Sequence, residues 1–302
     1  MIQQLCSVTV IKTLLCDPLS PPFMQNALLA VIMIGIVAGA VGAFVIVRKM
    51  AFLADALGHA ISPGVAVAYL IGGTRGPLLL GALVAGSLTA LIIGFFTRGG
   101  KLREDAVIGI VFTGALATGL ALMSVRQSAV DLEQLLVGNI LAVGSQDLFA
   151  IGVVSAIILI VIRAFYKELV LVSFDPVLGA TLQYPVEGLR YLLLLLLALT
   201  AVVAFQTIGV VLIAAMLVTP AATAYLLTRR LSRMMLLGAL FGSLSGIIGV
   251  MLAWYVNVSA SAAIVLTMTL GFVLAYIFAP ERGALWTWRS TRRHRLEAPA
   301  QP

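Results

Sequence analysis

Charge is what this 302-residue chain lacks most: only 10% of its residues are Asp, Glu, Lys or Arg, and 62% are hydrophobic. An average soluble domain carries roughly 25% charged residues, so the composition excludes one. Cysteine is nearly absent as well. Cys6 and Cys16 show no CxxC spacing and no other zinc-finger ligands accompany them, which excludes a zinc-stapled module. The fold class that remains is an all-α, polytopic bundle of transmembrane helices.

Nucleotide-binding motifs are also missing. The stretch 94–101 contains glycine and lysine, but it misses the P-loop spacing and has no Ser or Thr after the lysine. Buried carboxylates are scarce, because Asp55 is the only acid well inside an apolar segment, whereas a proton-coupled carrier often buries several. The chain is therefore expected to be a transport subunit rather than an enzyme, with its energy supplied by a separate partner.

Long apolar segments dominate the sequence, and each is close to the roughly 20 residues that a membrane helix needs. We predict spans near 24–47, 51–72, 77–97, 106–124, 147–165, 189–205, 207–228, 234–256 and 262–280. These nine crossings form one transmembrane domain over 23–281. The boundary between the sixth and seventh, at Gln206-Thr207, is weakly marked, so eight crossings remain an alternative.

Basic residues gather at the ends of these segments. Of the 19 Lys and Arg residues, 16 fall on one side when alternate loops are counted, and only Lys12, Arg75 and Arg126 fall on the other. The positive-inside rule then places the lead-in 1–22 outside or at the interface, and the basic tail 282–302 in the cytoplasm. This topology accounts for the net charge of +7, and no basic stripe interleaved with aromatics indicates a nucleic-acid partner.

Asp55 and His59 are the candidate metal ligands. They are four residues apart, so on a helix they share one face, with roughly 5–6 Å between their Cβ atoms. Ionisable side chains at membrane depth are costly and point to function, and a carboxylate beside an imidazole suits a borderline divalent metal. Two plainer interpretations stay open: Asp55 pairs with the preceding Arg48-Lys49, and His59 hydrogen-bonds a backbone carbonyl.

A loop at 166–189 on the cytoplasmic side is the second informative region. Asp175-Pro176 is typical of a helix N-cap followed by proline at the first helical position. The resulting short helix is expected to reach about Leu182 and to carry Leu178 and Leu182 on one side. It is either a docking surface for a soluble partner or a plain connector.

Glycine and proline predict how the helices meet. Gly35 with Gly39, and Gly242 with Gly246, form GxxxG patterns that mark close helix packing. Pro220 is expected to kink the seventh span, either beside a transport path or for packing alone.

The segment 131–144 is too short to cross the membrane and is interrupted by Gly138-Asn139. It is expected to dip in from the outer face or to lie along it. Asp131 and Glu133 either attract cations to an outer vestibule or are ordinary solvated charges.

Five blocks follow one another along the chain: Arg48-Lys49-Met50 leading to Asp55-Ala56-Leu57-Gly58-His59-Ala60 and Pro63-Gly64; Glu104 to Phe112; Val137 to Val143; Ser173-Phe174-Asp175-Pro176; and Leu217 to Ala224. In these blocks, from about 24 to 280, the chain resembles the integral-membrane permease subunits of bacterial zinc/manganese/iron ABC importers. It departs from the family pattern at Gly58, where serine is usual, and at Gln183-Tyr184-Pro185, where a Gly-Leu-Pro type turn is common.

The resemblance implies a homodimer in the bacterial inner membrane, with two cytoplasmic ATPase subunits that bind the ATP and an extracytoplasmic metal-binding protein. It implies that Asp55 and His59 contact the transported ion and that no cofactor is bound permanently. It also implies that the segment with Phe174, Asp175, Pro176, Leu178 and Leu182 docks on the ATPase.

Other functions stay open beside this one. An ABC permease for a metal chelate such as haem, a siderophore or cobalamin would need a wide path. A stand-alone ion-coupled carrier would work without an ATPase. An intramembrane hydrolase is disfavoured, because His59 has no recognisable Ser or Cys nucleophile elbow. The choice among zinc, manganese and iron is not encoded in one Asp and one His.

Overall fold

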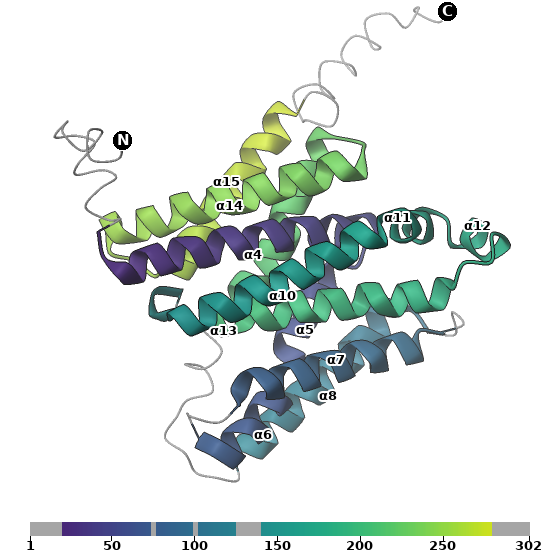
Figure 1. The fold of residues 1–302 in the computed structure, drawn as a ribbon, viewed down its shortest axis with the longest axis horizontal. Coiled ribbons are helices and arrows are strands. Elements are labelled where there is room, and N and C mark those ends of the chain that lie inside the picture. Colours follow the sequence, from purple (N-terminus) through teal and green to yellow (C-terminus); the bar gives the residue numbers. More distant parts are fainter. Residues whose placement is uncertain (1–19, 74–76, 99–101, 125–139, 280–302) are drawn as a thin grey trace, which may run out of the picture.

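The computed structural model describes residues 20–73, 77–98, 102–124 and 140–279, and every regular element within these ranges is helical (Figure 1). The helices are α4 (Pro22–Val47), α5 (Ala51–Ala60), α6 (Ser62–Gly72), α7 (Leu78–Phe96), α8 (Glu104–Ser124), the 3-10 turn η4 (Ile140–Ala142), α10 (Ser145–Ala164), α11 (Tyr166–Phe174), α12 (Pro176–Thr181), α13 (Val186–Leu227), α14 (Leu231–Val256) and α15 (Ala260–Phe278). The all-α bundle expected from the sequence is confirmed. The lead-in up to residue 19, the acidic part of 131–144 and the basic tail lie outside the described residues.

Eight of the described helical segments are long and apolar enough to cross a membrane, and Leu212–Leu227 is a shorter ninth apolar helix. One of the eight, Ala51–Gly72, is divided at Ile61 into α5 and α6. The break is local: Pro63 has no N–H to donate to the carbonyl of His59, one turn earlier, so the regular ladder is interrupted there.

Helix α13 contains the sharpest change of direction. Gly209 has φ 75° and ψ 167°, a conformation that is essentially restricted to glycine. A straight helix from Arg190 to Thr228 would be about 57 Å long, yet both residues lie near the end of α4, Arg190 through Arg48 and Thr228 beside Lys49. The chain therefore reverses at Gly209, close to the predicted boundary, and the described residues hold eight helices of membrane length and the shorter apolar helix Leu212–Leu227.

The sharpest irregularity of α13 does not lie at Pro220, where the sequence predicts a kink. Gly209 is the residue in α13 with non-helical dihedral angles, and Pro220 is buried within a helical stretch. The direction of α13 therefore changes eleven residues earlier than the proline.

Helix α4 lies at the centre of the bundle, where 72% of its most apolar window is buried, against 17% for α8 and for α15. Its main neighbour is α14. Gly35 faces the backbone of Gly242, and Gly39 faces that of Gly238, so the two helices meet at backbone contact. Both predicted GxxxG patterns take part, because Gly246 lies against Val31.

The described remainder of the segment 131–144 packs against α4. The side-chain amide of Asn26 donates a hydrogen bond of 3.2 Å to the carbonyl of Val143, and Ile140 is buried. Since Asn26 is near the start of α4, this contact lies at the opposite end of the bundle from Arg48. The two ends are referred to below as the Asn26 end and the basic end.

Candidate functional site

The candidate metal ligands lie on α5, as predicted. This helix begins at Ala51, directly after the turn at the basic end, so Asp55 is about 9 Å and His59 about 15 Å along the axis from Lys49. The second distance is about half of the roughly 30 Å thickness of a bilayer's hydrocarbon core. Both side chains are half-buried.

Two neighbouring helices, α8 and α13, pack against α5. Phe112 of α8 meets the His59 ring at a centroid distance of 5.5 Å and an interplanar angle of 64°. The same phenyl ring contacts Phe52 at 6.4 Å. Phe112 therefore covers one side of the imidazole and limits the directions in which its nitrogens can point.

The buried Nδ1 atom of His59 has no hydrogen-bond partner among the described residues. This removes support for the plain interpretation that His59 bonds a backbone carbonyl through that nitrogen. Nor does any ion pair in the described ranges join Asp55 to Arg48 or Lys49. A buried imidazole nitrogen without a partner is costly unless something else binds it, and a metal ion or a metal-bound water would do so.

Ser62 is a polar residue of this face that the sequence analysis missed. Its side chain is 2% exposed, and its Oγ has no hydrogen-bond partner in the part of the chain that is described. It contacts α8 at Gly119, where a Cβ would come within 2.6 Å of the hydroxyl. The available sequence signal was its position, three residues after His59 and directly before Pro63, where α6 begins.

One copy of the chain supplies an incomplete ligand set. The described residues contain no cluster of three or more His, Cys, Asp or Glu side chains that could hold a metal ion. Zinc prefers four ligands, and manganese prefers an octahedral shell rich in oxygen. Asp55 and His59 therefore need water or a second copy of the chain to complete the coordination.

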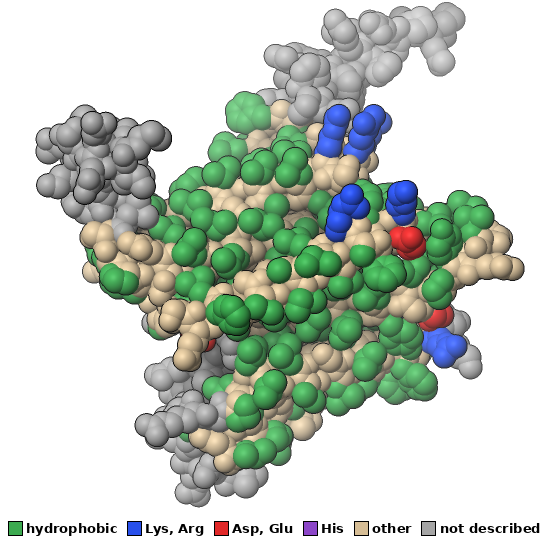
Figure 2. Space-filling model, in the orientation of Figure 1, with side chains coloured by type: hydrophobic (Ala, Val, Ile, Leu, Met, Phe, Trp, Pro, Cys, Tyr) green, Lys and Arg blue, Asp and Glu red, His purple; other side chains and the backbone are tan. Residues whose placement is uncertain are grey.

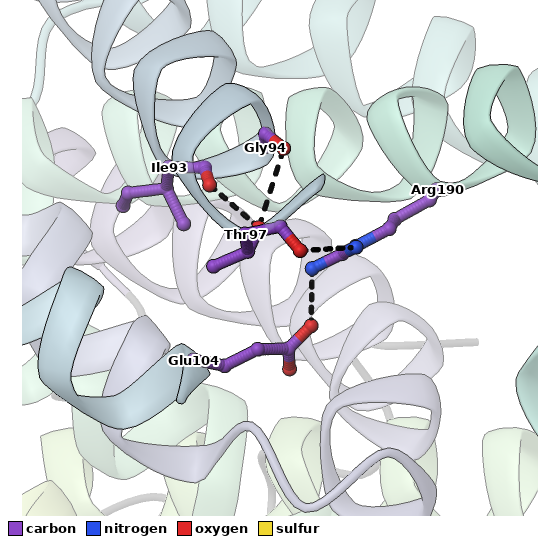
Figure 3. A network of polar contacts seen from close by, with 5 residues as sticks. All are labelled: Ile93, Gly94, Thr97, Glu104 and Arg190. Atoms are coloured by element: carbon purple, nitrogen blue, oxygen red, sulfur yellow. Dashed lines mark hydrogen bonds and ion pairs between the residues drawn. The ribbon is translucent and has the colours of Figure 1, made fainter. Parts of the chain in front are cut away.

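A second polar group, at the basic end, ties α7, α8 and α13 together (Figure 3). Arg190 of α13 pairs with Glu104 of α8 and donates a 3.3 Å hydrogen bond to the carbonyl of Thr97 after α7. The buried Thr97 hydroxyl in turn donates to Ile93 at 2.6 Å. Burial lowers the pKa of the nearby Arg48 guanidinium; Glu104 opposes this shift and Arg190 adds to it. The sequence analysis did not predict the Glu104–Arg190 pair, whose members are 86 residues apart in the chain.

The short helix in the loop 166–189 forms as predicted. Helix α12 begins at Pro176, and the Asp175 carboxylate accepts a 2.9 Å hydrogen bond from the N–H of Leu178. Gln183, just after the helix, has φ 61°. Glycine adopts such a positive φ at a lower cost than glutamine does, which accounts for the Gly-Leu-Pro type turn that is common at Gln183-Tyr184-Pro185. Figure 2 shows Lys and Arg side chains gathered toward the side of the molecule where α11 and α12 lie.

Apolar side chains on and beside α12 are exposed. Phe174 is 60% exposed, Val177 72%, Leu178 46% and Leu182 56%. They lie on helices too short to cross a membrane, at the basic end. Contiguous exposed apolar side chains of this kind mark interaction surfaces.

The apolar helices of the described residues, the half-buried Asp55–His59 face on α5 and the capped helix α12 at the basic end are together typical of membrane transport permeases. The ABC 3 transport family model matches residues 20–279, and the chain belongs to this family.

Individual relatives agree over nearly the whole chain. The manganese transport system membrane protein MntC of Halalkalibacterium halodurans is 43% identical over 282 residues, covering 93% of this chain and 96% of the relative. The manganese import system permease protein ScaB of Streptococcus gordonii is 42% identical over 260 residues, covering 86% and 92%. Among solved structures, PsaBC from Streptococcus pneumoniae in complex with Fab matches with a TM-score of 0.81 and 39% identity, covering 93% of this chain and 99% of that one.

Proposed function

We propose that this chain is the membrane subunit of an ATP-driven importer of divalent transition metal ions, with manganese as the best-supported cargo. The observation that carries this proposal is the Asp55–His59 face on α5, where the buried Nδ1 of His59 has no hydrogen-bond partner among the described residues. Family membership and the manganese names of the two relatives support the cargo and its class.

Two copies of the chain form the path in this proposal. A two-fold axis beside α5 brings a second Asp55 and His59 to the same point and doubles the ligand number from two to four. Water completes the shell. Binding through so few protein ligands keeps the affinity low enough for the ion to leave toward the cytoplasm.

The basic end faces the cytoplasm, because positively charged residues flank the spans there. The described Lys and Arg residues all fall at helix termini of this end: Arg48, Lys49, Arg98, Arg103, Arg163, Lys167, Arg190, Arg229, Arg230 and Arg233. Helix α12, with Phe174, Pro176, Leu178 and Leu182 around it, docks on a separate ATPase subunit. ATP binding and hydrolysis there move α11 and α12 and switch the path between outside and inside, and an extracytoplasmic metal-binding protein delivers the ion to the Asn26 end.

The test is manganese uptake by cells that carry the transporter with Asp55→Asn or His59→Ala. We expect at least a tenfold loss of uptake in both, with unchanged membrane abundance and unchanged co-purification of the ATPase. Asp147→Asn is the matched control, since the Asp147 carboxylate accepts a hydrogen bond from the N–H of Gly144 at the Asn26 end and an asparagine side chain keeps an acceptor oxygen there. Wild-type uptake by both site variants would refute the ligand assignment.

A chelate permease remains the competing transporter class. Uptake that is competed by a siderophore or haem, and not by free Mn²⁺, would favour it. Transport into vesicles that contain the purified chain without any ATPase would instead indicate a stand-alone carrier.

A further inference from the structure

A cavity of about 340 Å³ opens at the basic end, between the ends of α4, α11 and α13 and the start of α14. Its polar lining comes from Lys49, Ser173, Tyr225, Thr228 and Arg229. We call this cavity the basic pocket. It is separate from the Asp55–His59 face and from the Glu104–Arg190 pair.

The charges around the basic pocket are of one sign. Lys49 and Arg229 contribute two cations, and no described Asp or Glu residue lines the cavity. The Ser173 Oγ is buried and lacks a hydrogen-bond partner within the described ranges. Helix α14, 26 residues long, begins at the pocket with Leu231 and has no side-chain cap, so its first N–H groups add partial positive charge.

The backbone conformation of Lys49, which lines the basic pocket, is unusual for a lysine. Lys49 has φ 59°, in the left-handed region. Its N–H donates to Ile46 and the N–H of Met50 donates to Val45, which is the Schellman pattern in which glycine is strongly preferred at this position. A lysine lines the pocket from this conformation although glycine would fit the turn at lower cost.

We infer that the basic pocket binds the phosphate of an anionic lipid headgroup. Two cations and an uncapped helix N-terminus are groups from which phosphate oxygens accept hydrogen bonds, and the Ser173 hydroxyl in the pocket wall has no partner of its own among the described residues. The pocket lies where the membrane-length helices α4 and α14 meet the interface, and its wall includes apolar side chains such as Val47 and Met234 that suit the glycerol and upper acyl region. Basic pockets between helices on the cytoplasmic side are suited to such headgroups.

The inference uses the orientation given in the proposed function, in which the basic end faces the anionic cytoplasmic leaflet. An acidic side chain of the ATPase is the competing occupant, because Phe174 lines the same cavity. A free anion such as inorganic phosphate offers the same chemistry without a lipid. The experiment separates these three sources.

The test compares the purified transporter complex with Lys49→Gly/Arg229→Gln by native mass spectrometry after addition of phosphatidylglycerol or phosphatidylcholine. Glycine at position 49 relieves the strained turn, so this variant is expected to fold. The control Arg163→Gln/Lys167→Gln also removes two exposed cations from helix ends, away from the pocket. We expect the pocket variant to retain at least tenfold less phosphatidylglycerol than the wild type and the control, with equal phosphatidylcholine in all three.

Equal phosphatidylglycerol retention in all three proteins would overturn the inference. So would displacement of the lipid by millimolar inorganic phosphate, which would indicate a free-anion site, and so would loss of the ATPase with lipid retention unchanged. The mass measurement does not depend on transport. Failure of Asp55→Asn to reduce manganese uptake would therefore refute the proposed function and leave the lipid result standing.

Discussion

Arg190 of α13 forms an ion pair with Glu104 of α8, and Arg48 lies close enough to both for their charges to shift its pKa. Two guanidinium groups thus share one carboxylate at the basic end. Glu104 separates two cations that would otherwise repel each other in a partly buried setting. The pair joins two helices that have few direct contacts of their own.

Glu104→Gln is expected to destabilise the protein more than Arg190→Gln. The first change leaves Arg48 and Arg190 facing each other without an anion, whereas the second leaves Glu104 beside Arg48. The cost of Glu104→Gln should be about 1–3 kcal/mol, between the values for exposed and for buried pairs. Thermal unfolding of both variants in detergent measures the difference, and equal Tm values would show that Arg48 takes no part.

Gly39→Ala is expected to loosen the central helix pair. A Cβ at position 39 would overlap the backbone of Gly238 and Ala239, which cannot move without displacing α14. Overpacking of this kind costs about 1–3 kcal/mol. Gly271→Ala on α15 is the control, because a Cβ there meets nothing within 4 Å in the chain. Thermal stability should fall for the first variant and hold for the second.

Gly209→Ala is expected to disturb the reversal in α13. Its φ and ψ values lie where a Cβ is strongly disfavoured, at a cost of about 1–3 kcal/mol. The damage should appear as a lower yield of folded protein and a lower Tm. If Gly209→Ala were as stable as Gly271→Ala, the chain would not reverse through this conformation.

Asp175→Ala is expected to weaken α12 by about 0.5–2 kcal/mol, because the N–H of Leu178 loses its acceptor. Under the docking proposal this lowers the affinity for the ATPase and the coupled ATP hydrolysis. Asp175→Asn preserves an acceptor and should behave nearly as the wild type. The measurement is the amount of ATPase that co-purifies with each variant. A normal amount with Asp175→Ala would argue that α12 is a connector.

Much of this protein follows from its sequence because the controlling physics is local. Apolar segments of membrane length predict helices from Pro22 onward, Asp175 and Pro176 mark the start of α12, and the four-residue spacing puts Asp55 and His59 on one face. Each of these features depends on residues within a few turns of one another, so the local sequence is sufficient to predict it.

The tertiary structure decided the rest, because the partners are far apart in the chain. The residues around Glu104 in the sequence do not predict its pairing with Arg190, and those around His59 do not predict its contact with Phe112. The sequence analysis singled out Pro220, but the chain reverses at Gly209. The dihedral angles of this glycine depend on how the two halves of α13 pack. The basic pocket exists only where the ends of four distant helices meet, and no single segment contains it.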